Sequence, residues 1–223
     1  QQVKSFAKLT LKGERIWEKH APMDSGVYLK DEDTAPKKRW GRDAFMPTNY
    51  AFLPDGGFFL ADGYGSFRIH RYDKDGQWRS MFGKPGKGDG EFNTPHGIEV
   101  ANDGAVYVTD RANNRVQAFT LEGKFLKEGF IKRESKGTGT AFGVAFSADP
   151  EQRFVYIADG SNERIAILDR ASLEEIGQIG GPGRKAGEFF HLHSLDVDPQ
   201  GNIVTGESQG YRVQKFIFKG LSR

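Results

Sequence analysis

The sequence contains no cysteine among its 223 residues. Disulfide bonds, thiolate catalysis and cysteine-ligated zinc or iron–sulfur centres are therefore excluded. It also lacks any apolar run near the ~20 residues that a membrane-spanning helix needs, so we expect no membrane span. Its first residues show no charged segment followed by an apolar core, so we expect no signal peptide there.

The net charge is also small: the sequence has 32 basic and 30 acidic residues, which leaves a charge of +2. Nucleic-acid-binding proteins usually carry a basic face or stripe, so we expect no nucleic-acid partner. The one local basic cluster, Lys37-Lys38-Arg39, is interpreted as a solvated loop. With 28% charged and 37% hydrophobic residues, the composition is that of a soluble globular protein.

A repeated strand pattern organises the chain. The stretch from Gly90 to Phe119 reads as a strand, an Asn-Asp-Gly turn, a second strand, a short polar loop and a third strand. Three further copies place an acid at the end of the second strand, at spacings of 48, 49 and 48 residues; the four acids are Asp62, Asp110, Asp159 and Glu207. This period predicts an all-β propeller in which each repeat is one four-stranded blade.

An arginine follows each acid at the head of the third strand; the four are Arg68, Arg115, Arg164 and Arg212. A planar guanidinium suits bidentate contact with a carboxylate. We therefore predict an ion pair or hydrogen bond within each blade that fixes the turn.

We expect a single domain over 1–223, a length that allows a full core. Its blades are predicted at about 47–83, 95–131, 141–180 and 193–219, with a partial blade at 1–20. The partial blade matches only third and fourth strands, and the last blade lacks a fourth strand. Since exposed blade edges are templates for strand pairing, we expect homo-oligomers through the open edge.

The polar loop over 21–43 is long for a connection between strands. It is either a functional rim over a binding face or an ordered excursion.

Two inter-blade loops, GKPGKGDGEFNTPH and GGPGRKAGEFFHLH, repeat each other and place His96 and His193 in equivalent positions. No Gly-Lys-Ser/Thr follows the glycines, so they do not form a phosphate-binding loop. Both histidines begin innermost strands in alternate blades and would point to one mouth of the channel. Catalytic zinc usually takes three protein ligands, so this is a candidate metal site. Capping of the strand or bridging of channel waters is the alternative.

The blades resemble NHL repeats, and the stretch from Asp62 to Phe119 is similar to peptidyl-α-hydroxyglycine α-amidating lyase, which cleaves peptidyl-hydroxyglycine to a peptide amide and glyoxylate. The resemblance implies a six-bladed propeller, of which about four and a half blades are present, and a secreted or periplasmic protein. It implies zinc held by three histidines from alternate blades, two of which match His96 and His193. It also implies an active-site tyrosine at Tyr64, in Asp-Gly-Tyr, and an active-site arginine at Arg111, in Thr-Asp-Arg.

Departures from the family pattern concern the metals. The family's first zinc histidine and one further blade are not in this sequence. Ser194 stands where the family has an aspartate that helps to hold calcium, which speaks against a calcium site. Because residues two apart on a strand face the same way, we hypothesise a replacement zinc site of His96, His191 and His193.

The other two histidines, His20 and His70, are expected at the surface, His70 because it lies in a third strand away from the channel.

Two functions remain open. In the first, a lyase-like zinc site uses Tyr64 as general base and Arg111 to orient the substrate carboxylate, as a carbon–nitrogen lyase active in peptide amidation. In the second, a non-catalytic NHL propeller binds a peptide or protein ligand on its rim loops, Tyr64 fills a turn, and Arg111 pairs with a neighbouring carboxylate.

Overall fold

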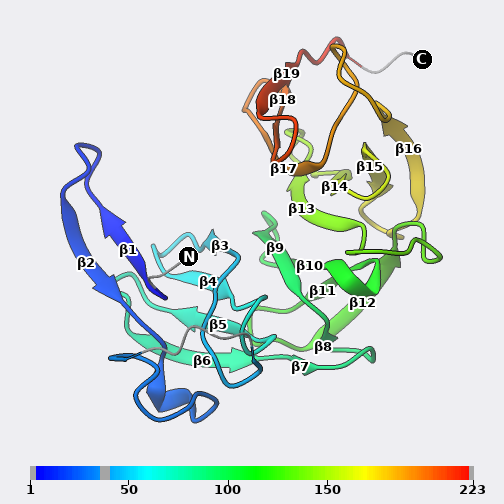
Figure 1. Cartoon of the computed structure of the whole chain (residues 1–223). Coiled ribbons are helices and arrows are strands. Elements are labelled where there is room, and N and C mark those ends of the chain that lie inside the picture. Colours follow the sequence, from blue (N-terminus) through cyan, green and yellow to red (C-terminus); the bar gives the residue numbers. More distant parts are fainter. Residues whose placement is uncertain (1–3, 36–40, 221–223) are drawn as a thin grey trace. The chain divides into compact units, whose positions relative to one another are not determined.

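The computed structural model describes residues 4–35 and 41–220 (Figure 1). The Lys37-Lys38-Arg39 cluster lies outside these residues. Within them the regular structure is strand, apart from two short 3-10 turns, η1 (Met23–Ser25) and η2 (Arg111–Asn113). This confirms the all-β prediction. None of the helices in the described part of the chain is long and apolar enough to cross a membrane.

The chain forms two compact units, Gln1–Ile98 and Glu99–Arg223. The first unit holds a hairpin and a four-stranded antiparallel sheet in the order β3-β4-β5-β6. Its strands are β1 (Phe6–Leu9), β2 (Arg15–Lys19), β3 (Asn49–Phe52), β4 (Phe58–Ala61), β5 (Ile69–Tyr72), β6 (Trp78–Phe82), and the short parallel pair β7 (Lys84–Pro85) and β8 (Glu91–Phe92). The prediction of one domain over 1–223 stays a prediction.

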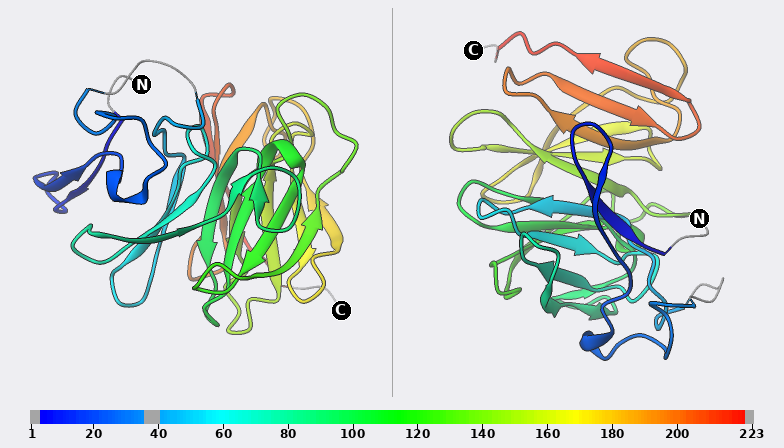
Figure 2. Two further views of the ribbon diagram at one scale, coloured as in Figure 1. Left: turned by 90° about the horizontal axis from the view of Figure 1, so that it is seen from below. Right: turned by 90° about the vertical axis from the view of Figure 1, so that its left-hand side faces the viewer.

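The second unit continues the same construction in chain order (Figure 2). A sheet in the order β12-β11-β10-β9 is followed by a four-stranded sheet and a three-stranded one. The strands are β9 (Pro95–Val100), in which the division between the units falls, β10 (Val106–Asp110), β11 (Arg115–Phe119), β12 (Phe125–Phe130), β13 (Ala141–Phe146), β14 (Phe154–Asp159), β15 (Arg164–Asp169), β16 (Glu175–Ile179), β17 (Leu192–Val197), β18 (Ile203–Glu207) and β19 (Arg212–Phe216). Antiparallel strands that pair in chain order are the blades of a propeller.

Apolar side chains that alternate along the strands form the core of each unit. In the second unit Tyr107, Val116, Val144 and Ile157 belong to one buried cluster, which joins the sheet that contains β10 and β11 to that of β13 and β14. In the first unit an aromatic cluster of Phe45, Phe58 and Tyr72 packs against the hairpin through Phe6 and Trp17. Each fully buried large side chain contributes about 1.5–3 kcal/mol to stability.

The predicted acid–arginine pair is confirmed in three of the four blades. The pairs are Asp110–Arg115 at 2.8 Å, Asp159–Arg164 at 2.9 Å and Glu207–Arg212 at 2.5 Å.

For the first blade the prediction is wrong. Arg68 donates to the carbonyl oxygen of Gly83 at 2.6 Å, while Asp62 accepts hydrogen bonds from Met46, Ser66 and Tyr28. The physical reason is the length of the turn between the acid and the arginine. Arg68 stands six residues after Asp62, whereas the other arginines stand five after their acids, and the extra residue changes the course of the turn.

His70 is a second correction, because this expected surface residue is completely buried. Its ring bonds to Tyr28 at 2.6 Å and to Trp78 at 3.2 Å. Tyr28 belongs to the long polar loop, so this part of the loop is an ordered excursion that covers β5. His20 is exposed, as expected.

Candidate functional site

The structure brings together two of the predicted site residues, Tyr64 and His96, within the first unit. Tyr64 lies in the turn between β4 and β5, and His96 lies at the start of β9, where it is buried. The tyrosine hydroxyl and Nε2 of His96 are 2.9 Å apart and form a hydrogen bond. The two rings meet edge to face, with centroids 5.6 Å apart. A phenol and an imidazole in this arrangement can exchange a proton.

A close backbone approach sets this geometry. A Cβ atom on Gly63 would lie 1.8 Å from the carbonyl oxygen of Pro95, so only glycine lets the turn come this near to the start of β9. The hydroxyl of Thr48 donates to the same carbonyl at 2.8 Å. Pro95 is thus fixed directly before His96, and the turn that holds it delivers Tyr64. The Asp-Gly-Tyr motif therefore needs its glycine for contact as well as its tyrosine.

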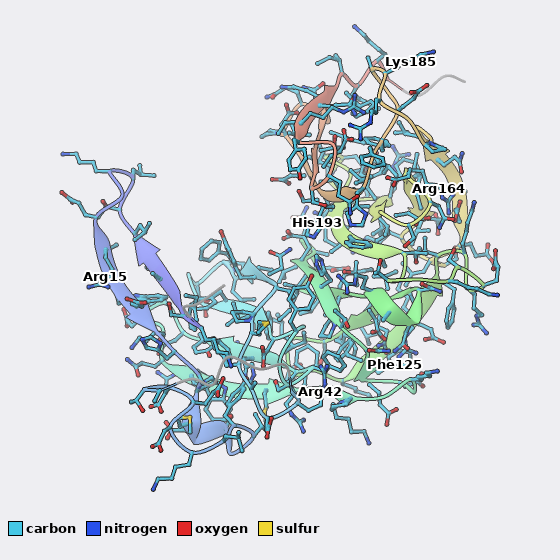
Figure 3. All side chains as sticks on the ribbon, viewed as in Figure 1. Arg15, Arg42, Phe125, Arg164, Lys185 and His193 are labelled. Atoms are coloured by element: carbon cyan, nitrogen blue, oxygen red, sulfur yellow. The ribbon has the colours of Figure 1, made fainter. Side chains whose placement is uncertain are left out.

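The other predicted residues, Arg111, His191 and His193, gather around Phe142 in the second unit. The guanidinium carbon of Arg111 lies 5.0 Å from the centroid of the Phe142 ring, within the range of a cation–π contact. Both histidine rings meet the same phenylalanine edge to face, each with centroids 5.4 Å apart. Figure 3 labels His193, on β17.

The surroundings of His193 favour the neutral form of its imidazole. The pKa of His193 is lowered mainly by burial, and further by the positive charges of His191 and Arg111. A neutral imidazole is the form that ligates metals and accepts protons.

The sequence pattern did not assign a role to Phe142. The repeat places Phe142 or Gly143 at the position that corresponds to the two histidines, and that alignment is the available signal.

His191 does not sit on a strand with His193, as the hypothesis of a shared face assumes. It precedes β17, and its φ of 59° lies in the left-handed region, so strand alternation does not apply. A side-chain oxygen of Glu163 accepts the backbone N–H groups of His191 at 2.6 Å and of Leu192 at 3.2 Å, which fixes this conformation. The two histidine rings have centroids 6.4 Å apart. On one tetrahedral zinc with Zn–N bonds near 2.0 Å, they would be roughly 5 Å apart.

Histidine, aspartate and glutamate side chains do not gather in threes as a metal site anywhere in residues 4–35 and 41–220. The donor chemistry of His96 and His193 nevertheless fits zinc, because both present imidazole nitrogens and the neutral form of His193 is favoured. The set of His96, His191 and His193 stays a prediction.

Comparison with known proteins supports the repeat family. The sequence pattern of the NHL repeat matches residues 92–119. Peptidyl-glycine alpha-amidating monooxygenase A of Xenopus laevis is 34% identical over 184 residues, which cover 77% of this chain and 19% of that protein. Peptidyl-alpha-hydroxyglycine alpha-amidating lyase 1 of Drosophila melanogaster is 25% identical over 206 residues, 82% of this chain and 37% of the fly protein. The chain thus spans about a fifth and a third of these relatives.

Among solved structures, virginiamycin B lyase of Staphylococcus aureus with quinupristin superimposes with a TM-score of 0.62 at 16% identity. The match covers 97% of this chain and 64% of that one. At this identity the similarity shows the fold alone.

Proposed function

We propose that this chain, an NHL-repeat protein built of β-propeller blades and similar in sequence to peptidyl-α-hydroxyglycine α-amidating lyases, cleaves peptidyl-α-hydroxyglycine to a peptide amide and glyoxylate. The observation that carries the proposal is the hydrogen bond between Tyr64 and His96. It joins two residues that the family resemblance separately assigns to the active-site tyrosine and a zinc histidine.

Tyr64 serves as the base in this proposal. A hydrogen bond donated by the Nε2–H of His96 to the Tyr64 oxygen would stabilise the phenolate, which can then take the proton of the substrate hydroxyl. As the carbonyl group of glyoxylate forms, the C–N bond breaks and its electron pair goes to nitrogen. Tyr64 returns the proton to that nitrogen, so the reaction needs no net proton.

Arg111 serves to bind the substrate carboxylate through two parallel hydrogen bonds. Its guanidinium lies against the Phe142 ring, which limits the planes that it can adopt. When bound by His96 and His193, a zinc ion would supply Lewis-acid polarisation of the substrate hydroxyl.

The test combines metal analysis with a glyoxylate-release assay on a synthetic peptidyl-α-hydroxyglycine. We expect about one zinc per chain, lost in His96→Ala, and a fall in kcat of about 10²–10⁴-fold in Tyr64→Phe. Because Nε2 of His96 bonds to Tyr64, zinc would bind through Nδ1, and Tyr64→Phe should retain it. His20→Gln, at an exposed position, is the control. No glyoxylate from zinc-loaded protein would refute the enzymatic proposal.

A non-catalytic role in peptide binding is the second candidate, favoured by an aromatic groove in the first unit. The groove has a volume of about 410 Å³, and its lining includes Trp17, Phe58, Tyr50 and Phe52. Tyr50 and Phe52 are more than half exposed. Binding of a fluorescent apolar peptide that is abolished by Phe52→Asp and retained by Tyr64→Phe would support this role.

A further inference from the structure

The turn that carries Tyr64, residues 62–67, is held by a segment distant in sequence. In the other blades an arginine of the same blade pairs with the acid that begins this turn. Here the acid is Asp62, and its partners include Tyr28, which belongs to the preceding excursion, and Met46, which lies between that excursion and β3. This exchange of partners makes the excursion part of the support of Tyr64.

Asp62 ties the excursion to the turn. Its carboxylate is fully buried. One oxygen, Oδ1, accepts the backbone N–H of Met46 at 2.6 Å. The other, Oδ2, accepts the backbone N–H of Ser66 at 2.7 Å and the hydroxyl of Tyr28 at 2.9 Å. One carboxylate therefore accepts hydrogen bonds from Tyr28 and Met46, which precede β3, and from Ser66 in the turn.

The direction of the hydrogen bonds behind Tyr28 follows from donor chemistry. An indole nitrogen can only donate, so Nε1 of Trp78 donates to Nδ1 of His70 at 3.2 Å. The neutral ring then carries its proton on Nε2, which donates to the Tyr28 oxygen at 2.6 Å. The hydroxyl proton of Tyr28 is thereby directed to Asp62. The chain from Trp78 to Asp62 has one consistent polarity; His70 and Asp62 are buried, and Trp78 and Tyr28 are half-buried.

The excursion also grips the residues beside Tyr64. The backbone N–H of Tyr64 donates to the carbonyl oxygen of Met46 at 3.1 Å. Arg42, labelled in Figure 3, donates through Nη1 to the carbonyl oxygen of Gly65 at 2.8 Å, and its guanidinium lies 3.1 Å from the centroid of the Phe67 ring. A Cβ atom on Gly65 would lie 2.3 Å from the carbonyl oxygen of Ala44, so a residue with a side chain does not fit at this contact.

We propose that Tyr28 and Arg42 are positioning residues for Tyr64, and that segments 28–35 and 41–46 form the clamp that holds the tyrosine against His96. The inference rests on the proposed function for its catalytic consequence, although the clamp itself is defined by contacts alone. Removing the Tyr28 hydroxyl takes one donor from buried Asp62 and breaks the chain from Trp78. The turn then loses its fixed distance to β9.

The test compares Tyr28→Phe with Tyr72→Phe in the full chain. Tyr72 is a buried tyrosine of the same blade whose hydroxyl has no hydrogen-bond partner among the described residues, so its loss controls for removal of a buried hydroxyl. The first readout is the ¹⁵N signal of the His96 imidazole by NMR, identified with His96→Gln. We expect Tyr28→Phe to shift this signal and Tyr72→Phe to leave it in place.

The second readout is glyoxylate release. We expect kcat to fall about 10²-fold in Tyr28→Phe with KM unchanged, because small misplacements of a reacting group cost about this much. An unchanged His96 signal in folded Tyr28→Phe would overturn the proposal. If that variant does not fold, Arg42→Ala, at an exposed position, replaces it in the same NMR comparison, and an unchanged signal there overturns the proposal equally. A shifted signal in a protein without lyase activity would uphold the clamp and refute the proposed function alone.

Discussion

Acid should weaken the first unit through His70. Burial, with a smaller contribution from the positive charge of Arg68, lowers the pKa of this histidine to about 3. The hydrogen bonds of the ring also lower the pKa of His70. Nδ1 accepts from the indole of Trp78, and a proton added there would face another donor. Protonation must therefore open the contact with Trp78 or unfold the blade.

The sign and size follow from linkage. The folded-state pKa of His70, about 3, lies below its ordinary value of 6.5. The stabilisation is therefore fully present above pH 6.5 and is lost as the pH falls toward 3. With 1.36 kcal/mol per pKa unit, the loss between pH 7 and pH 5 is about 2 kcal/mol. Burial raises the pKa of nearby Asp62, whose contribution declines as the pH rises, so the effect of His70 must be isolated by a variant.

Tryptophan fluorescence suits the assay, because the chain's three tryptophans all precede residue 99 in the sequence, where the second unit begins, and Trp17 and Trp78 lie in the described part of the first unit. Urea unfolding at pH 7 and pH 5 should show wild-type protein losing about 2 kcal/mol more than His70→Gln, whose amide does not titrate. His20→Gln should keep the wild-type pH dependence. Equal pH dependence in His70→Gln and wild type would refute the reasoning.

Three further expectations concern the blades and their edges. Arg115→Ala should lower the free energy of unfolding by about 3–5 kcal/mol, because it removes the cation that pairs with the buried Asp110 carboxylate. Arg212→Ala should lower it by less, because the side chain of Arg212 is 25% exposed. Equal losses of the two variants in urea unfolding, followed by circular dichroism, would contradict this. Gly63→Ala should shift the NMR signal of the His96 imidazole, since its Cβ meets a backbone carbonyl, whereas Gly181→Ala enters open space and should not. Val213→Lys on edge strand β19 should abolish a concentration-dependent dimer in sedimentation; a wild-type monomer at all concentrations would exclude pairing through this edge.

Periodicity was sufficient to predict the blades, because a blade is a local meander whose turns and strands lie within one repeat. The acid that ends the second strand and the arginine five residues later are close in sequence and close in space, as Asp110 and Arg115 show. His96 came from the repeated inter-blade loops and Tyr64 from the family resemblance, and their hydrogen bond joins neighbouring repeats. Contacts between the turn of one repeat and the first strand of the next are expected, because the repeats follow one another along the chain.

The failures arose where distant segments decide the environment. His70 occupies a third-strand position that the pattern places at the surface, but Tyr28, 42 residues earlier, covers it. No periodicity in β5 reports on which loop packs over it. The loss of the Asp62–Arg68 pair had a visible signal, the spacing of six residues, but the replacement partners belong to the excursion. A polar loop of that length gives little indication of where it docks.

The residue after the acid in the first three of the four blades accompanies the alternation of histidine with phenylalanine on the following inner strand. Gly160 approaches the carbonyl oxygen of Leu192, where a Cβ would lie 2.5 Å away, just as Gly63 approaches that of Pro95. In both cases the residue after that carbonyl is the histidine, His193 or His96.

In the blade between these two, the glycine and the histidine are both replaced. The residue after Asp110 is Arg111 in place of glycine, and the equivalent inner-strand position holds Phe142, against which the guanidinium packs. The close backbone approach is made here from the other side, since a Cβ atom on Gly139 would lie 1.9 Å from the carbonyl oxygen of Arg111, and the Phe142 ring provides the surface that the cation needs. In all three blades a glycine therefore permits the close approach, and it stands after the acid where the following inner strand carries histidine and before the inner strand where that strand carries Phe142.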